Sequence, residues 1–209
     1  MRLLTTFTLL TICLTAIGQT APIKKDNRKK ALTFYPGTYI DTETLYADST
    51  GIVVITQNSL PKGGAYTDSI GRTFGYRIFW TRIINETATP IELTINFPAD
   101  SFEIVARPDS YLRVFLPPDT MTLYNETLYD YGATGLKSFL DAGLNKPTML
   151  QRTINPKEAC LFYIGVLIDP AGNNFTRAGL VLKEQHLFYR ITPQLDSALI
   201  PCGQIVLKN

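Results

Sequence analysis

The sequence predicts an all-β protein, an antiparallel β-sandwich of about nine strands with one short helix. Apolar residues recur with period two along most of the chain, which is the pattern of β-strands. Turn residues interrupt the apolar runs at short intervals, as they do in sandwiches and barrels. Chain length and strand number favour an immunoglobulin-like sandwich, although Trp80 precedes both late cysteines instead of lying between them. A closed barrel is the alternative architecture.

Short apolar runs carry the expected strands. In the run from Ile91 to Phe97, apolar residues alternate cleanly with polar ones, as they do when one face of a sheet is solvated. Segments 73–84 and 159–168 are apolar on both parities, so we expect them to be central strands with both faces covered. The other strands are expected over residues 51–56, 102–106, 111–116, 177–182, 187–191 and 203–208.

One short helix is expected after residue 134. Thr134 could cap its N-terminus and Gly143 could end it. A small apolar face is formed by Leu136, Phe139 and Leu140. We expect this helix to cover one end of the sandwich.

The N-terminus has the features of a cleavable secretory signal. Met1 and Arg2 form a short positive region, and an apolar run with interspersed threonines follows up to Ile17. Cleavage between Gly18 and Gln19 would leave small residues before the cut. The apolar run is shorter than the roughly 20 residues that a membrane span needs.

Three regions follow from these features: a signal peptide over residues 1–18, a basic lead-in segment over 19–43 and a single β-sandwich domain over 44–209. Lipid attachment at Cys13 is the alternative for the N-terminus, but Cys13 lies inside the apolar run and follows the bulky Ile12. We therefore expect an exported chain with no transmembrane segment after signal removal. Its formal net charge of +2 gives no reason to expect a nucleic-acid partner.

Two cysteines, Cys160 and Cys202, remain after signal removal. In an oxidising compartment they could form one disulfide. On the chain-entropy model, closing a loop of some 40 residues would stabilise the fold by roughly 4 kcal/mol. Cys160 lies in an apolar strand, so a free, buried thiol fits the sequence equally well.

Three strings resemble a group of small exported bacterial β-sandwich proteins of unassigned function: Asn85–Leu93, Leu116–Asp119 and Ile154–Glu158. The likeness covers most of residues 50–209. Because the strings are turns and strands, the resemblance implies a shared fold and carries no functional residue.

Catalytic and metal-binding patterns are sparse in this sequence. The single histidine, His186, lies in an expected hairpin, and one histidine with two distant cysteines cannot supply a zinc site. We therefore expect no catalytic residue, no metal and no cofactor. Paired carboxylates remain a route to polysaccharide hydrolysis. None of the candidates lies in an apolar context that would raise its pKa; they are Glu86, Glu92, Asp100, Glu103 and Glu126.

One segment, residues 124–132, has the composition of a ligand-binding surface. Aromatic rings stack on sugars or peptides while neighbouring polar groups make hydrogen bonds. The candidate ligand-binding residues are Tyr124, Tyr129, Asp130 and Tyr131. In the alternative interpretation, these tyrosines seal one end of the sandwich against Phe139 and Leu140.

Together these features predict a secreted or periplasmic protein of the bacterial cell envelope. We expect a non-enzymatic binding or structural module, with a glycan or an envelope protein as its partner. The alternative is a small polysaccharide hydrolase, or an accessory subunit of one, that uses paired carboxylates. A purely structural subunit that pairs through an exposed edge strand is a third option.

Overall fold

The computed structural model describes residues 39–49, 51–100, 102–103, 109–142, 145–171, 177–192 and 199–207, all within one compact unit, Thr38–Asn209. The expected signal peptide, its cleavage point at Gly18 and Gln19, and Cys13 lie outside the described residues. So does most of the expected lead-in segment, although its end belongs to the first strand.

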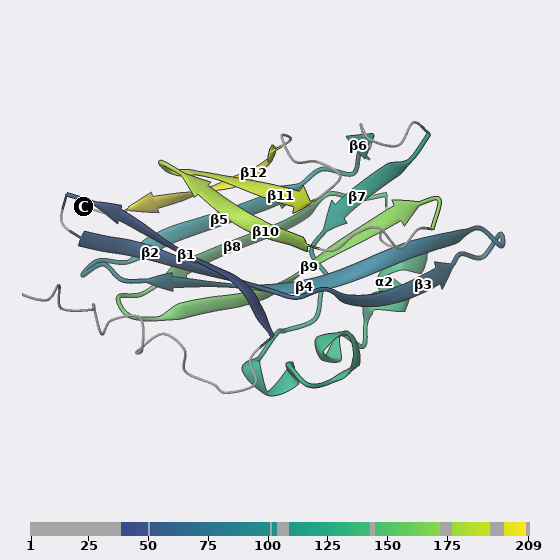
Figure 1. The fold of residues 1–209 in the computed structure, drawn as a ribbon, viewed down its shortest axis with the longest axis horizontal. Helices are drawn as coiled ribbons and strands as arrows, with labels where there is room; N and C mark the ends of the chain where they lie inside the picture. The colour runs from purple at the N-terminus through teal and green to yellow at the C-terminus, as the bar shows by residue number, and fades with distance from the viewer. Residues whose placement is uncertain are drawn as a thin grey trace, which may run out of the picture. The chain divides into compact units, whose positions relative to one another are not determined.

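The described residues form two antiparallel sheets, which confirms the prediction of an all-β, sandwich-like protein (Figure 1). The larger sheet has the order β1-β2-β4-β9-β7-β6, and β3 also pairs with β4. Its strands are β1 (Ile40–Asp48), β2 (Gly51–Ser59), β3 (Lys62–Thr67), β4 (Thr73–Asn85), β6 (Phe102–Glu103), β7 (Tyr111–Phe115) and β9 (Ala159–Asp169). The smaller sheet has the order β10-β11-β12-β5-β8. Its strands are β5 (Ile91–Phe97), β8 (Thr148–Ile154), β10 (Arg177–Lys183), β11 (His186–Thr192) and β12 (Leu199–Leu207).

The described part of the chain therefore has twelve strands rather than about nine. The additional ones are β1, β3 and β8. Strand β3 begins with Lys62-Gly63-Gly64, and paired glycines are more typical of a turn than of a strand. It forms because the long strand β4 offers one edge to two partners in succession: β2 pairs with its C-terminal part and β3 with its N-terminal part. Between them, the Ser59 hydroxyl accepts a hydrogen bond from the Trp80 amide at 2.8 Å.

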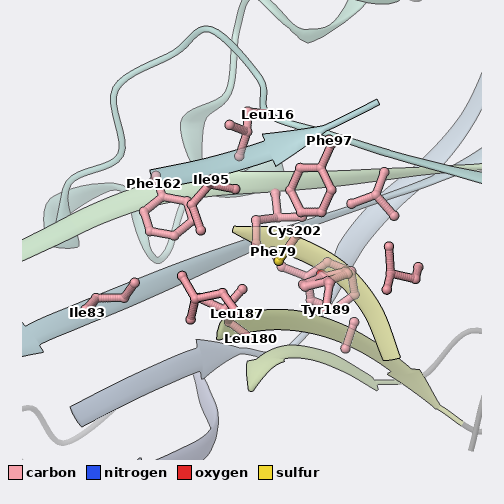
Figure 2. Packing of buried hydrophobic residues seen from close by; sticks show 14 of the residues in the cluster. Phe79, Ile83, Ile95, Phe97, Leu116, Phe162, Leu180, Leu187, Tyr189 and Cys202 are labelled. Atoms are coloured by element: carbon pink, nitrogen blue, oxygen red, sulfur yellow. The ribbon is translucent and has the colours of Figure 1, made fainter. Parts of the chain in front are cut away.

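The first hydrophobic core lies between the two sheets (Figure 2). Alternate residues of β4 and β9, such as Phe79 and Ile164, meet the inward side chains of the smaller sheet. Tyr189 packs edge-on against two rings, with centroid distances of 6.5 Å to Phe79 and 5.8 Å to Phe97. In β5 the buried and more exposed positions alternate as the sequence predicts.

A second core covers the opposite face of the larger sheet. The segment 116–142, here called the cover segment, contains η1 (Leu123–Asn125), η2 (Tyr129–Gly132) and α2 (Leu136–Ala142). Leu136 and Leu140 of α2 pack with Ile78 and Trp80 of β4. The helix thus exists where expected, but it covers a sheet face and not an end of the sandwich (Figure 1). Both faces of β4 and β9 are buried for this reason, as the two-parity pattern predicts.

The N-terminus of α2 is capped from a distance. Asp119 Oδ1 accepts a hydrogen bond from the Gly135 amide at 3.0 Å, and the Thr134 hydroxyl lies 3.4 Å from the same oxygen. Asp119 therefore caps the helix instead of Thr134, and the Thr134 hydroxyl donates to Asp119. Gly143, the expected end of the helix, lies outside the described residues.

Side chains of the larger sheet make hydrogen bonds to backbone groups along the outer edge of β10. Asn58 Oδ1 accepts a hydrogen bond from the Leu180 amide at 2.9 Å, and Asn58 Nδ2 lies 3.5 Å from the Leu180 carbonyl oxygen. The Tyr46 hydroxyl accepts from the Leu182 amide at 2.8 Å. Because these backbone groups already have partners, this stretch of β10 is a poor place for another strand to pair.

The two cysteines are free in the structure and lie on different sheets. Cys160 of β9 is half-buried, and Cys202 of β12 is buried among the core rings (Figure 2). This is the free-thiol arrangement that the sequence left open beside a disulfide. Burial raises the pKa of both thiols, that of Cys202 to about 12.

Candidate functional site

A pocket of about 730 Å³ lies where the cover segment meets β3 and β4. This volume is within the range of about 300–1,000 Å³ that is usual for small-molecule sites. We call it the tyrosine pocket; it is lined by Ala65, Tyr66, Thr67, Tyr76, Leu128, Tyr129, Asp130, Gly132, Ala133, Thr134, Leu136, Lys137 and Leu140. Its lining combines aromatic rings, aliphatic side chains and a few polar groups, which is the usual composition of a ligand site.

Asp130 is the polar centre of this pocket. Its side chain is only 4% exposed, and Oδ2 accepts a hydrogen bond from the Tyr76 hydroxyl at 2.5 Å. Oδ1 is buried and has no hydrogen-bond partner among the described residues. Burial raises the pKa of the Asp130 carboxyl, while the Tyr76 hydrogen bond and the charge of Lys62 oppose that rise. The site therefore holds a carboxyl group with unused acceptor capacity.

Two further tyrosines, Tyr129 and Tyr66, line the pocket. The Tyr129 hydroxyl lies 3.3 Å from that of Tyr76, and the rest of its side chain is largely exposed. Tyr66 is buried, and its hydroxyl donates to Asp141 Oδ1 at 2.7 Å. Asp141 also forms an ion pair with Lys137 at 2.9 Å, so the charge at this rim of the pocket is balanced.

Lys62 fixes the cover segment to the sheet beside the pocket. Its Nζ donates to the carbonyl oxygens of Glu126 and Leu128, each at 2.6 Å. The ammonium also lies 4.3 Å from the ring centroid of Tyr39 and 4.1 Å from that of Tyr131. Burial lowers the pKa of Lys62, and the nearby carboxylates oppose that change.

The backbone at Asp130 and Tyr131 is left-handed, with φ of 46° and 56°, and Gly132 follows with φ of 76°. Such angles are unfavourable for residues other than glycine, by roughly 1–2 kcal/mol each. Hydrogen bonds on both sides hold the turn. The Tyr131 hydroxyl donates to the Leu60 carbonyl at 2.6 Å, and the Tyr163 hydroxyl donates to the Tyr131 carbonyl at 2.6 Å.

The structure separates the four residues that the sequence proposes as ligand-binding. Tyr129 and Asp130 line the tyrosine pocket. Tyr131 is fully buried in the second core, so its ring packs inside the protein, but against a face of the larger sheet and not at an end of the sandwich. Tyr124 is 94% exposed and is not part of the pocket lining.

Several residues of the site are not indicated by the sequence. Tyr66, Tyr76 and Lys62 lie on strands far from residue 130 in the chain, and only the pairing of β3 with β4 brings them together. The one indication in the sequence is that β4 has apolar residues on both of its faces. This pattern predicts that another part of the chain covers Tyr76. Lys137 is an ordinary polar position of the expected helix.

Glu126 corrects the expectation that no candidate carboxylate has a raised pKa. It is buried, its Oε1 has no hydrogen-bond partner within the described part of the chain, and burial raises its pKa. The residues around Glu126 in the sequence are polar and do not predict its burial, because the neighbouring sheet provides that burial. Glu126 does not line the tyrosine pocket.

The other candidate carboxylates have structural partners or lie apart from the pocket. Glu86 accepts from Lys157 at 2.8 Å and Glu92 from Thr153 at 2.7 Å. Asp100 is an exposed residue beyond β5, and the side chain of Glu103 lies outside the described residues. His186 is exposed at the start of β11.

The described residues contain no cluster of three or more histidine, cysteine, aspartate or glutamate side chains that could hold a metal ion. They also contain no helix of the length and apolar character needed to cross a membrane.

Comparison of the chain with protein families, curated proteins and solved structures gives no match. The resemblance to small exported bacterial proteins therefore stays a prediction.

Proposed function

We propose that this chain is a non-enzymatic binding module that holds a glycan in the tyrosine pocket. The observation that carries the proposal is the buried Asp130 carboxyl group, with an unused acceptor, beside the exposed ring of Tyr129. Sugars present both an apolar ring face and hydroxyl donors, so they match an aromatic wall next to a carboxylate. A peptide ligand is a poorer match, because few amino-acid side chains combine a flat apolar face with several hydroxyl groups.

The proposal is tested by measuring affinity for a panel of oligosaccharides with the secreted chain. Tyr129→Ala should weaken binding about tenfold, since a stacked aromatic contact contributes up to roughly 1.5 kcal/mol. Tyr124→Ala is the matched control, because Tyr124 lies on the same cover segment but outside the pocket. Equal affinities for Tyr129→Ala and the wild type would contradict this assignment of the site.

We further propose that the protein acts outside the inner membrane, as a secreted or periplasmic protein of the bacterial cell envelope. The support is the N-terminal pattern of a positive start, an apolar run and small residues before Gln19. Cell fractionation with N-terminal sequencing of the exported form tests this. A mature chain that begins at Gln19 is the expected result, and a cytosolic chain that keeps Met1 would overturn the proposal.

We also assign the fold to the immunoglobulin-like sandwiches. In the larger sheet, the order β2-β4-β9-β7 parallels the strand order A-B-E-D of that fold. The smaller sheet departs from it, because β5 pairs with the last strand, β12, and not with the strand that follows β9. The assignment therefore rests on the larger sheet.

Hydrolysis is the alternative function, and it needs two carboxylates in one cleft. Among described residues, Asp130 is the one carboxylate that lines the tyrosine pocket.

A second groove, between β1 and β10, contains Asp41 and Glu43. Arg177 forms an ion pair with Asp41 at 3.0 Å, and Gln57 donates to Glu43 at 2.6 Å. Release of reducing ends from a bound polysaccharide, abolished by Asp130→Asn, would favour hydrolysis over binding alone.

A further inference from the structure

We propose that the sugar unit in the tyrosine pocket is uncharged, and that its hydroxyl groups donate to the Asp130 carboxylate. This inference rests on the glycan-binding function proposed above and adds the chemical class of the ligand. It also gives Asp130 the role of the residue that determines specificity.

The two carboxyl oxygens of Asp130 differ in their hydrogen bonding. Tyr76 fixes Oδ2 at 2.5 Å, so the carboxyl group is held in one orientation, while Oδ1 has no partner within the described part of the chain. A buried acceptor without a donor is unfavourable, and most such groups in native proteins are satisfied by a partner, a water or a ligand. A hydroxyl group of the ligand can supply the missing donor.

The charges around the pocket are balanced. The negative charge of Asp130 is opposed electrostatically by Lys62 of β3. At the rim formed by α2, Lys137 and Asp141 form an ion pair at 2.9 Å. Because these charges are already balanced, neither an anionic nor a cationic sugar would find a free counter-charge in the pocket, and burying a charge without one is unfavourable.

A ligand must also reach Asp130, which is buried. Tyr129 beside it is 76% exposed, and its hydroxyl makes a long contact of 3.3 Å with that of Tyr76. Because Oδ1 of Asp130 is itself buried, the proposal requires the Tyr129 side chain to turn away from Tyr76 when a ligand binds. The ring then lies against the apolar face of the sugar, while the aliphatic floor formed by Leu136 and Leu140 stays in place.

The experiment compares one glycan in three charge states. A neutral oligosaccharide found to bind is oxidised at its primary hydroxyls to the uronate, and an amino derivative of the same chain length is prepared. Calorimetric titration of the wild-type chain should give the highest affinity for the neutral form and at least a tenfold loss for the uronate. Equal or tighter binding of the uronate or the amino form would overturn the inference.

Asp130→Asn is the matching variant. Asparagine tolerates the left-handed backbone at this position and can still accept the Tyr76 hydrogen bond. It replaces the unused acceptor by a donor, so affinity for the neutral glycan should fall at least tenfold, whereas Tyr124→Ala should bind like the wild type. Unchanged affinity in Asp130→Asn would contradict the role of Asp130.

Failure of this inference can be told apart from failure of the proposed function. If no oligosaccharide binds, or if Tyr129→Ala binds as tightly as the wild type, the glycan site itself is wrong. If glycan binding depends on Tyr129 but ignores ligand charge and Asp130, only the inference fails. If Asp130→Asn does not fold, the affinities of the wild-type chain for the neutral, uronate and amino forms still test the inference.

Discussion

Lys62→Met tests whether one lysine holds the cover segment on the sheet. Lys62 Nζ donates two hydrogen bonds at 2.6 Å, to the carbonyl oxygens of Glu126 and Leu128. It also lies within 4.3 Å of the ring centroids of Tyr39 and Tyr131. Methionine keeps the length and apolar character of the side chain but removes the ammonium group.

The expected loss of stability is about 3 kcal/mol. A hydrogen bond from a charged donor contributes roughly 1.5–3 kcal/mol, and the lower value applies because the bond to Leu128 is exposed. Each contact with a ring adds about 0.5–1 kcal/mol at a partly exposed site. Methionine removes the cost of partly burying a charge and gains some apolar contact, which offsets the ring contribution.

Hydrogen exchange measures this loss where it occurs. Amides of residues 123–133 should exchange about 100-fold faster in Lys62→Met, because about 1.4 kcal/mol corresponds to each factor of ten. Lys157→Met is the control, since Lys157 also makes two hydrogen bonds, at 2.7 and 2.8 Å, but on the surface. That change should cost about 1 kcal/mol or less. Exchange of residues 123–133 within threefold of the wild type would refute the reasoning.

Three further outcomes are expected. Gly165→Ala should lower the free energy of unfolding by about 1–3 kcal/mol, because its Cβ would lie 2.3 Å from the Phe115 ring; Phe115→Leu should recover part of this loss in denaturant titrations, and no recovery would contradict the clash. Burial raises the pKa of Tyr131 to about 12, so the folded state favours the protonated phenol. Stability should then fall as pH rises from about 10, the unfolded value, toward 12, and a constant stability over that range would contradict it. Cys202, with a pKa of about 12, should react with thiol reagents only after denaturation; a denatured chain that shows neither Cys202 nor Cys160 as a thiol would instead contain a disulfide.

The larger part of the fold could be predicted because alternation of apolar residues records which faces are buried. The segment Ile91–Phe97 shows this most clearly, since its predicted and observed buried positions coincide. Strand β3 could not be predicted in the same way. Gly63 has a φ of 150°, and a Cβ there would lie 2.2 Å from the Tyr76 carbonyl oxygen. The two glycines that look like a turn are therefore what allows β3 to approach β4.

The candidate site could be predicted only in part, for a physical reason. Tyrosines and an aspartate in one segment indicate a ligand surface, but not which side chains face inward. That depends on the left-handed turn at Asp130 and Tyr131, which buries the second ring and leaves the ring of Tyr129 exposed. The partner of Asp130 is Tyr76, 54 residues away, and no local pattern joins them.

The two faces of the larger sheet differ in a way that bears on function. Among the described residues, the core between the sheets contains no buried carboxylate; its buried polar groups, such as Asn58, Thr81 and the Tyr189 hydroxyl, are neutral. The covered face instead contains Asp130 and Glu126, both buried with raised pKa values, and two consecutive residues with a strained backbone. A cover segment that served only to shield Trp80 and Ile78 from water would need none of these features.

Unfavourable conformations and unsatisfied polar groups that collect beside a pocket are characteristic of sites that bind something. The covered face of the larger sheet, and not the loops at the ends of the sandwich, is therefore where binding should be sought.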